Sequence, residues 1–284
     1  MGVMPSKPTW ESTGKHVLIT GASSGIGAEL ARNFAKEGAK IALISRSVKE
    51  LEAVAAECLK LGSPKAEVFN CDITDNVQTN TAMKAAMASF GRFDVVILNA
   101  GRSQGCYFDE IKDVDQIDYM LQLNANGPIK ILHHLLPSVP KASSSRIVFI
   151  SSVSGLIGVP YRTVYCSSKF ALSGFANALR IEFGDKYGDA APRVTLINFP
   201  EVGGTELNSN RMDMGAERPP AQFNTTGILS VEEACVGAMT AVAGGVREWG
   251  HPAKISVLLP LYRLIPSIID GIILKTVKKT HYRS

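Results

Sequence analysis

Short, almost wholly apolar runs alternate along this chain with longer stretches in which apolar residues recur at helical spacing. Runs of this kind predict strands that are buried on both faces of a sheet. Six of them stand out, at His16–Thr20, Ile41–Ile44, Ala66–Phe69, Val95–Leu98, Ile147–Ile150 and Val194–Ile197. The stretches between them, such as Val48–Leu61 and Val77–Phe90, have the periodicity of helices. The chain therefore reads as repeated βαβ units.

Repeated βαβ units leave few possible architectures. Crossovers between parallel strands are right-handed, so successive units build an open parallel sheet with helices on both faces. The 284 residues, 45% hydrophobic and 20% charged, can bury one large core. We therefore expect an α/β protein with a doubly wound (Rossmann) parallel sheet, in a single domain over residues 15–252 that follows a tail at residues 1–14.

Charge and cysteine content narrow the function classes. The net charge of +4 is mild, and no basic run is interleaved with aromatic residues, so we expect no nucleic-acid partner. Five scattered cysteines without a C-x-x-C pair argue against a disulfide framework and favour a reducing compartment. Residues 1–14 lack the apolar core of a secretory signal, so we expect a cytoplasmic protein. No metal site is expected.

A glycine-rich turn, Thr20–Gly27, follows the first predicted strand and opens a helix that runs to about Lys36. Glycine lets the backbone turn sharply and approach a pyrophosphate, which also meets the exposed amides of the helix N-terminus. The expected dinucleotide contacts are Gly21, Ser23, Ser24, Gly25, Ile26 and Gly27. A plain tight connection is the alternative, but the strand-first, helix-next order favours a cofactor site.

The residues after the next three strands indicate which dinucleotide fits. Ser45-Arg46-Ser47 stands where NAD enzymes usually place an acidic residue. A guanidinium suits a 2′-phosphate, so Arg46 favours NADP(H); a solvated arginine before a helix is the alternative. Asp72 could accept from the adenine amino group or cap the helix that follows. Asn99, Ala100 and Gly101 end the fourth strand, where the sheet edge approaches the cofactor or simply turns.

Further along, Tyr165 and Lys169 stand one helical turn apart, thirteen residues after Ser152. Carbonyl reduction needs a proton donor and alcohol oxidation needs a base, and a phenol can be both if a nearby ammonium lowers its pKa. Ser152 would hold the carbonyl oxygen near the phenol and the nicotinamide. Asn124 lies on the helix before the fifth strand. A surface Tyr and Lys, a capping Ser and a helix-kinking Asn are the alternatives, but together and in this order the residues favour a catalytic set.

With these motifs in place, the chain resembles the short-chain dehydrogenases/reductases over roughly residues 16–205. The family motif T-G-x-x-x-G-x-G falls on Thr20–Gly27, N-A-G on Asn99–Gly101 and Y-x-x-x-K on Tyr165–Lys169. The resemblance implies that Lys169 also binds the nicotinamide ribose, next to Tyr165, and that Asn124 holds a water in a proton relay. It also implies a homo-oligomer, a dimer or tetramer.

One segment departs from the family pattern. The family usually has P-G-x-V/I-x-T after the sixth strand, where this chain reads Pro200-Glu201-Val202-Gly203-Gly204-Thr205. Pro200 and Thr205 keep their places and are expected cofactor contacts. Glu201 replaces the glycine, and Gly203 replaces the branched residue whose backbone meets the carboxamide. From Gly203 to Gly227 the sequence is rich in Gly, Pro, Asn and Thr and has no clear strand or helix periodicity, and we expect a substrate lid there.

Residues 253–284 form an apolar and basic C-terminal extension. Its apolar content is interrupted at Pro260, Arg263, Pro266 and Asp270. We therefore expect two short helices broken near Pro266, which could lie in a membrane interface or form an oligomer contact, rather than a membrane span. The extension is similar to those of the subgroup around dehydrogenase/reductase member 7 and the 11β-hydroxysteroid dehydrogenases. Met1–Ser6 also fits an N-myristoylation pattern, a second route to peripheral attachment on the cytosolic face of an internal membrane.

The predicted function is that of an NADP(H)-dependent oxidoreductase interconverting a carbonyl and an alcohol. The resemblance of the extension implies a small lipophilic substrate such as a steroid, retinoid or lipid ketone. A non-catalytic NADP(H)-binding sensor or scaffold is the alternative, favoured by Glu201 and Gly203 but not by Tyr165, for which a pure binder has no use. A 3-ketosphinganine-type reductase is a further alternative within the enzyme class.

Overall fold

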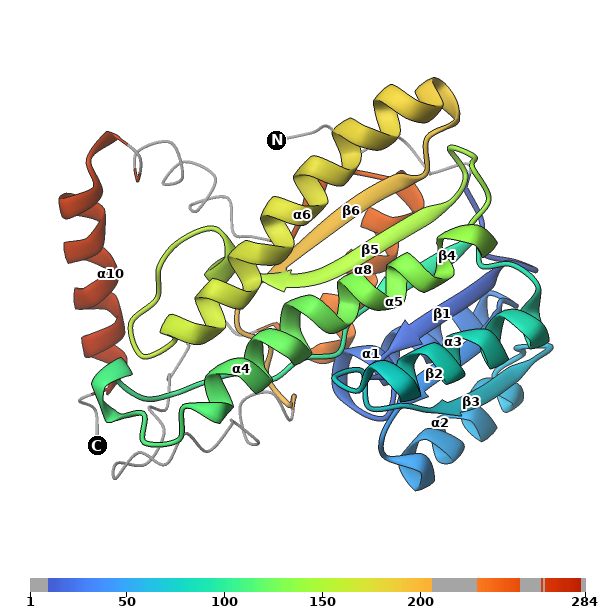
Figure 1. Ribbon diagram of the computed structural model, residues 1–284, viewed down its shortest axis with the longest axis horizontal. Coiled ribbons are helices and arrows are strands. Elements are labelled where there is room, and N and C mark those ends of the chain that lie inside the picture. Colours follow the sequence, from blue (N-terminus) through green and yellow to red (C-terminus); the bar gives the residue numbers. More distant parts are fainter. Residues whose placement is uncertain (1–9, 206–228, 251–261, 263, 282–284) are drawn as a thin grey trace.

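A single parallel sheet forms the centre of the protein (Figure 1). The computed structural model describes residues 10–205, 229–250, 262 and 264–281. Within these residues, seven strands lie in the order β3-β2-β1-β4-β5-β6-β7, and every neighbouring pair is parallel. They are β1 His16–Thr20, β2 Lys40–Ser45, β3 Ala66–Asn70, β4 Val95–Leu98, β5 Arg146–Ser152, β6 Arg193–Phe199 and β7 Glu248–Trp249. The six predicted strands are confirmed, each to within two residues at either end.

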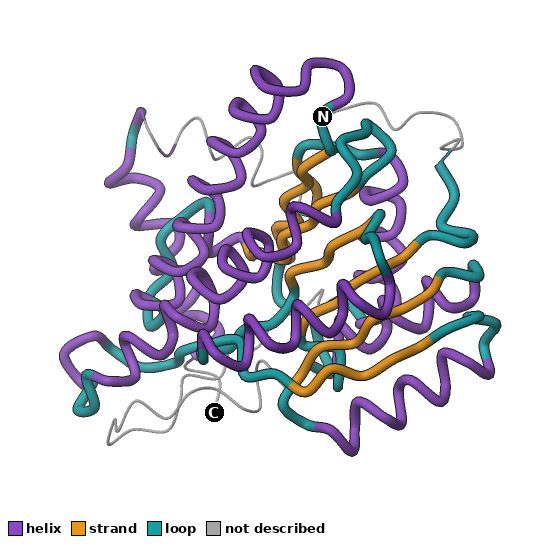
Figure 2. Tube along the Cα trace, turned by 45° about the vertical axis from the view of Figure 1, so that its right-hand side comes forward, coloured by secondary structure: helices purple, strands orange, loops and turns teal. Residues whose placement is uncertain are grey.

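Helices cover both faces of the sheet (Figure 2). One face packs against α1 Gly25–Lys36, α2 Val48–Lys60 and α8 Val231–Gly244. The other packs against α3 Asn76–Phe90, α5 Gly127–Leu135 and α6 Thr163–Tyr187. The remaining described helices are α4 Asp115–Leu121, the π-helix η2 Gln122–Asn126, the 3₁₀ turns η1 Phe108–Glu110, η3 Leu136–Ser138, η4 Val153–Gly155 and η5 Gly188–Ala190, and α10 Pro266–His281. The expected doubly wound architecture is confirmed.

The two cores explain why the strands read as unbroken apolar runs. Val17 and Ile19 of β1 enter the core beneath α1, α2 and α8, whereas Leu18 enters the core beneath α3, α5 and α6. All three side chains are fully buried. Since successive strand residues point to opposite faces, burial on both faces requires apolar residues at every position.

The strand order reverses at β1, which has β2 on one side and β4 on the other. Connections from neighbouring strands therefore leave toward opposite faces at this point and open a crevice at the carboxyl ends of the strands. Asn99 closes the base of that crevice, because its Nδ2 donates to the carbonyl oxygens of Thr20 at 3.0 Å and Gly21 at 3.1 Å. The sheet thus places the glycine-rich turn beside the end of β4.

Side chains fix where the helices next to the crevice begin. Asp75 caps α3 by accepting from the amides of Val77 and Gln78. The alternative role of Asp72 as the cap of this helix is therefore wrong. At the start of α8, Ser230 and Glu233 form a reciprocal capping box.

Of the C-terminal extension, residues 262 and 264–281 are described. Helix α10 begins at Pro266, where the break was predicted, and proline is favoured in the first turn because it has no amide to leave unpaired. Residues 253–261 lie outside the described residues, as do residues 206–228 of the predicted lid and the myristoylation pattern at residues 1–6. Of the helices that the structure describes, none is both long enough and apolar enough to cross a membrane.

Candidate active site

A cleft of about 530 Å³ opens at the carboxyl ends of the central strands. Almost every predicted cofactor and catalytic residue lines it; the exceptions are Gly27 and Asn124. These two residues lie behind the lining of the cleft, where each has a packing or hydrogen-bonding role. A Cβ at Gly27 would stand 2.2 Å from the carbonyl oxygen of Gly21, so its glycine is needed for the packing of the turn itself. The side chain of Asn124 is fully buried among backbone and hydroxyl partners.

The glycine-rich turn has the shape that a pyrophosphate requires. Gly21 and Gly25 adopt φ of +64° and +53°, in the left-handed region that glycine enters without strain. Ser24 is the N-cap of α1 but makes no side-chain hydrogen bond to the helix, so its first amides point to the cleft uncapped. A Cβ at Gly25 would meet only Thr205, at 3.8 Å. Uncapped amides at the positive end of a helix dipole, beside open space, fit a phosphate-bearing cofactor.

Arg46 lies at the end of β2 in a cluster with an acid and a phenol. Its Nη1 donates to Asp72 Oδ2 at 3.2 Å and to the hydroxyl of Tyr119 at 2.7 Å. The other oxygen of Asp72 accepts from the amide and hydroxyl of Thr74. Burial raises the pKa of Asp72, but the hydrogen bonds from Thr74 and the charge of Arg46 outweigh it and leave the pKa below its usual value. The carboxylate therefore stays charged and orients the guanidinium.

Tyr119 was not among the predicted site residues. It comes from α4, and its ring also packs against the small apolar cluster around Tyr165, formed with Cys106, Met120 and Val164. Nothing in the sequence distinguishes Tyr119 from an ordinary amphipathic position. Its position beside Arg46 depends on the way α4 crosses toward the end of β2.

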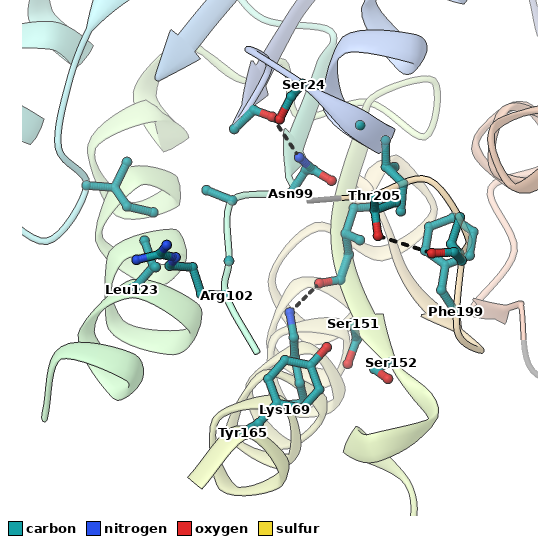
Figure 3. Close-up of a pocket in the computed structure, with 18 of the residues that line it drawn as sticks. Ser24, Asn99, Arg102, Leu123, Ser151, Ser152, Tyr165, Lys169, Phe199 and Thr205 are labelled. Carbon is teal, nitrogen blue, oxygen red and sulfur yellow. Dashed lines mark hydrogen bonds between the residues drawn. The ribbon is translucent and has the colours of Figure 1, made fainter. Parts of the chain in front are cut away.

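Helix α6 and strand β5 bring the predicted catalytic residues together (Figure 3). Tyr165 and Lys169 are buried, with 2% and 4% of their surface exposed, and Ser152 ends β5. Lys169 Nζ donates to the carbonyl oxygen of Ile150 at 3.0 Å and lies 5.7 Å from the centroid of the Tyr165 ring. Figure 3 shows the phenol hydroxyl directed toward Ser151 and Ser152 at the end of β5. The three residues thus meet at one place in the cleft.

The electrostatics of the phenol differ from the expectation. Burial raises the pKa of Tyr165, while the charge of Arg162 and a hydrogen bond with Ser152 act in the opposite direction. Burial also lowers the pKa of Lys169, to about 8. The expected net lowering of the phenol's pKa by Lys169 is wrong for this structure, because both groups lie out of water and desolvation is the larger effect.

Asn124 lies within the π-helix between α4 and α5. Its Oδ1 accepts from the Arg102 amide at 2.8 Å, and its Nδ2 donates to the Arg102 carbonyl at 2.8 Å and to Ser168 Oγ at 3.1 Å. Ser168 Oγ donates in turn to the carbonyl of Tyr165 at 2.7 Å. The amide of Asn124 therefore ties the loop after β4 to the helix turn that carries the phenol.

Gln104 is a second residue that sequence reasoning missed. It is fully buried in the loop after β4. Its Oε1 accepts from the amides of Val164 at 2.9 Å and Tyr165 at 3.4 Å, so it caps the start of α6 from a distant part of the chain. A glutamine in a loop carries no recognisable pattern, and only the fold reveals this role.

The unusual segment after β6 lies along the cleft. Pro200, Glu201 and Thr205 line it, and Glu201 is partly buried. Val202, with 5% of its surface exposed, belongs to the core and pairs with Leu229. Thr205 Oγ1 donates to the carbonyl of Val202 at 3.1 Å. The apolar anchor of this segment is therefore one residue earlier than in the family pattern.

Comparison with known proteins agrees with this geometry. A family model described as "short chain dehydrogenase" matches residues 15–214. An Arabidopsis thaliana protein named "11-beta-hydroxysteroid dehydrogenase-like 4A" is 30% identical over 263 residues, which cover 93% of this chain and 85% of that protein. "Dehydrogenase/reductase SDR family member 7" of Mus musculus is 37% identical over 195 residues, which cover 68% of this chain and 56% of that protein.

Solved structures give the same fold. An alcohol dehydrogenase from the archaeon Thermococcus sibiricus, complexed with 5-hydroxy-NADP, superposes with a TM-score of 0.67 at 26% identity, covering 84% of this chain and 95% of that one. A short chain dehydrogenase/reductase from Burkholderia phymatum in complex with NAD superposes with a TM-score of 0.77 at 22% identity, covering 92% of this chain and 96% of that one.

Proposed function

Because this chain belongs to the short-chain dehydrogenase/reductase family of oxidoreductases, we propose that it interconverts a carbonyl and a secondary or primary alcohol with NADP(H). The observation that carries the proposal is the meeting of Ser152, Tyr165 and Lys169 at one end of a cleft whose other walls are the glycine-rich turn and Arg46. A binder of nucleotides alone has no need of a buried phenol beside a buried amine.

Each residue has a separate task in the proposed reaction. The nicotinamide cofactor supplies or accepts the hydride. Ser152 Oγ donates a hydrogen bond to the carbonyl oxygen and holds it within reach of the phenol. Tyr165 gives its proton to that oxygen during reduction and removes it during oxidation. Lys169 lies beside the ring of Tyr165, where it can also contact the nicotinamide ribose, as the family resemblance implies.

Asn124 supports the proton relay in this proposal. Its side-chain amide already has three hydrogen bonds, to the backbone of Arg102 and to Ser168. A relay water would therefore be held by the main chain of Asn124, with the side chain fixing the position of that main chain. The same contacts hold the turn of α6 that carries Tyr165.

The preference for NADP(H) rests on Arg46. Its guanidinium lies at the end of β2, half exposed, and Asp72 and Tyr119 orient it. A planar cation at this position suits a 2′-phosphate in charge and geometry. Asp72, whose oxygens already accept from Arg46 and Thr74, contributes to the adenosine end by holding Arg46. We retain its contact with the adenine amino group as a prediction.

The substrate is proposed to be lipophilic, such as a steroid, retinoid or lipid ketone. The names of the relatives include hydroxysteroid dehydrogenase-like proteins of plants and amphibians. Val153, Val159 and Phe199 contribute apolar surface to the cleft near Ser152 and Tyr165. A 3-ketosphinganine-type reductase would use the same cleft.

The C-terminal extension is proposed as a membrane contact. Ile268, Ile272 and Leu274 of α10 are exposed, while Ile269 is buried. The sequence becomes basic directly afterwards, with Lys275, Lys278 and Lys279. An apolar face followed by positive charge suits an anionic bilayer surface. Flotation of the full-length chain with vesicles, compared with a chain truncated after Pro252, tests this; equal partitioning would instead favour the oligomer contact.

The substitution Tyr165→Phe tests the proposed activity. It should abolish NADPH-dependent reduction of a ketone panel while leaving NADPH affinity within a few-fold. Tyr187→Phe, on the same helix but packed against Phe183, is the matched control and should keep full activity. Turnover that survives Tyr165→Phe would reject the mechanism. A wild-type protein that binds NADPH but oxidises none of it would favour the sensor or scaffold.

A further inference from the structure

Arg162 is a charged residue in the cleft that the reaction described above does not use. It is the N-cap residue of α6, three positions before Tyr165. Only 8% of its surface is exposed, and it lines the cleft. Its guanidinium carbon lies 5.8 Å from the centroid of the Tyr165 ring. A buried guanidinium is uncommon in proteins, and this one lies against the phenol that the proposed reaction uses.

Two cations therefore flank one ring. Lys169 Nζ lies 5.7 Å from the Tyr165 centroid, almost the same distance as the guanidinium carbon of Arg162. Burial lowers the pKa of Lys169 to about 8, so its charge falls in mildly alkaline solution. Guanidinium groups stay protonated throughout the range in which proteins are folded.

We infer that Arg162 is a positioning residue whose positive charge stabilises the phenolate form of Tyr165. The inference rests on the proposed function, because it requires Tyr165 to exchange the proton. Arg162 adds its charge to that of Lys169, whose amine lies at nearly the same distance from the ring.

Apart from Lys169 and Arg162, the described groups that surround Tyr165 are not cations. Lys169 and Cys166 lie on the same helix, Ser152 comes from β5, Cys106 from the loop after β4 and Tyr119 from α4. Among the effects on the pKa of Tyr165, burial is the largest and raises it; Arg162 comes next and lowers it, ahead of the hydrogen bond with Ser152. Cys166 acts weakly in the raising direction. Of these side chains, Arg162 and Lys169 are the two that bring a cationic group close to the ring.

The test follows the ionisation of the phenol directly, so it requires no substrate. A ring-fluorinated tyrosine, whose phenol ionises near neutral pH, is incorporated at position 165 of the full-length chain, and its ¹⁹F resonance is followed against pH. The chain is compared with Arg162→Gln, Arg162→Lys and Arg193→Gln in the same background. Arg193 is exposed at the opposite, amino end of β6, so Arg193→Gln removes one positive charge far from the phenol.

Arg162→Gln should raise the phenol's pKa by about one unit or more, the usual effect of removing a neighbouring opposite charge. Arg193→Gln should leave the titration unchanged, and Arg162→Lys should keep most of the wild-type value at neutral pH. If Arg162→Gln does not fold, Arg162→Ala titrated with and without added guanidinium ion replaces it, and the ion should move the pKa back down. Titrations of Arg162→Gln or Arg162→Ala that match the wild type would overturn the inference, even if both variants weaken substrate binding.

The experiments distinguish a failure of this inference from a failure of the proposed function. If Tyr165→Phe keeps its turnover, the function fails whatever the titration shows. If Tyr165→Phe is inactive and the titration does not respond to Arg162, only the present inference fails.

Discussion

The side-chain carbonyl of Gln104 accepts the main-chain amide of Val164 at 2.9 Å, across sixty residues of sequence. The contact ties the loop that follows β4 to the first turn of α6, one residue before the phenol of Tyr165. Helix starts need acceptors for their first amides, and buried amides without one are costly. The position of the proposed proton donor therefore depends on a glutamine that takes no part in the chemistry.

Gln104→Ala should lower both stability and turnover. It leaves the amides of Val164 and Tyr165 without their acceptor, at a cost of about 1–3 kcal/mol in the free energy of unfolding. Because a small displacement of a reacting group reduces rate strongly, kcat should fall about tenfold or more. Gln104→Glu keeps an acceptor oxygen and should restore much of kcat. Urea unfolding and steady-state kinetics measure both effects. A destabilised variant with unchanged kcat would show that Gln104 does not position Tyr165 for the reaction.

Arg46→Gln should change cofactor preference. Loss of a bidentate partner for a 2′-phosphate should weaken NADPH binding by about 2 kcal/mol or more, while NADH binding changes little. Tyr119→Phe, which removes one hydrogen-bonding partner but keeps the guanidinium, should have a smaller effect in the same direction. Fluorescence titration of the wild type and both variants with NADPH and NADH gives the six affinities. Equal losses for NADPH and NADH would mean that Arg46 does not meet the 2′-phosphate.

Substitutions at two glycines should act on different quantities: one should lower NADPH affinity and the other should raise stability. Gly27→Ala places a methyl group 2.2 Å from the Gly21 carbonyl oxygen and 2.6 Å from Asn99 Nδ2, so the turn must distort and NADPH affinity should collapse. Gly174→Ala lies on an exposed position of α6 with nothing within 4 Å, and should raise stability by about 0.5–1 kcal/mol. Thermal melts with and without NADPH distinguish the two. Tight NADPH binding by Gly27→Ala would contradict the packing argument.

The buried amine of Lys169 should make the free energy of unfolding depend on pH. Its pKa is about 8 in the folded chain and 10.5 without burial. Between these values the unfolded chain binds more protons, so this group makes the folded state more stable as pH rises. The gain approaches about 3 kcal/mol across the window. Lys169→Met lacks the group, so the difference in unfolding free energy between wild type and variant should widen in favour of the wild type from pH 8 to 10.5; a constant difference would show that the amine is not desolvated.

Much of the fold could be predicted because its pattern is local. Burial on both faces requires apolar strands, and the two helical stretches named from periodicity match α2 and α3 almost to the residue. The glycine-rich turn and the Tyr165 to Lys169 spacing are also local, and the structure brings both to one cleft.

What the sequence could not predict arises from contacts between distant segments. Gln104, Tyr119 and Arg162 acquire their places only when the loop after β4, α4 and the start of α6 converge. The direction of the Tyr165 pKa was wrong for a related reason: spacing along a helix reveals a neighbouring amine, but the depth of burial depends on everything packed around both groups.

Tyr119 links Arg46 to the apolar cluster that contains Tyr165, since its hydroxyl accepts from Arg46 and its side chain packs against that cluster. A change in the proposed cofactor contact at Arg46 should therefore also affect the surroundings of Tyr165. If Arg46 binds the 2′-phosphate as proposed, substitutions that switch the cofactor should change turnover as well, and Tyr119 belongs among the positions to redesign.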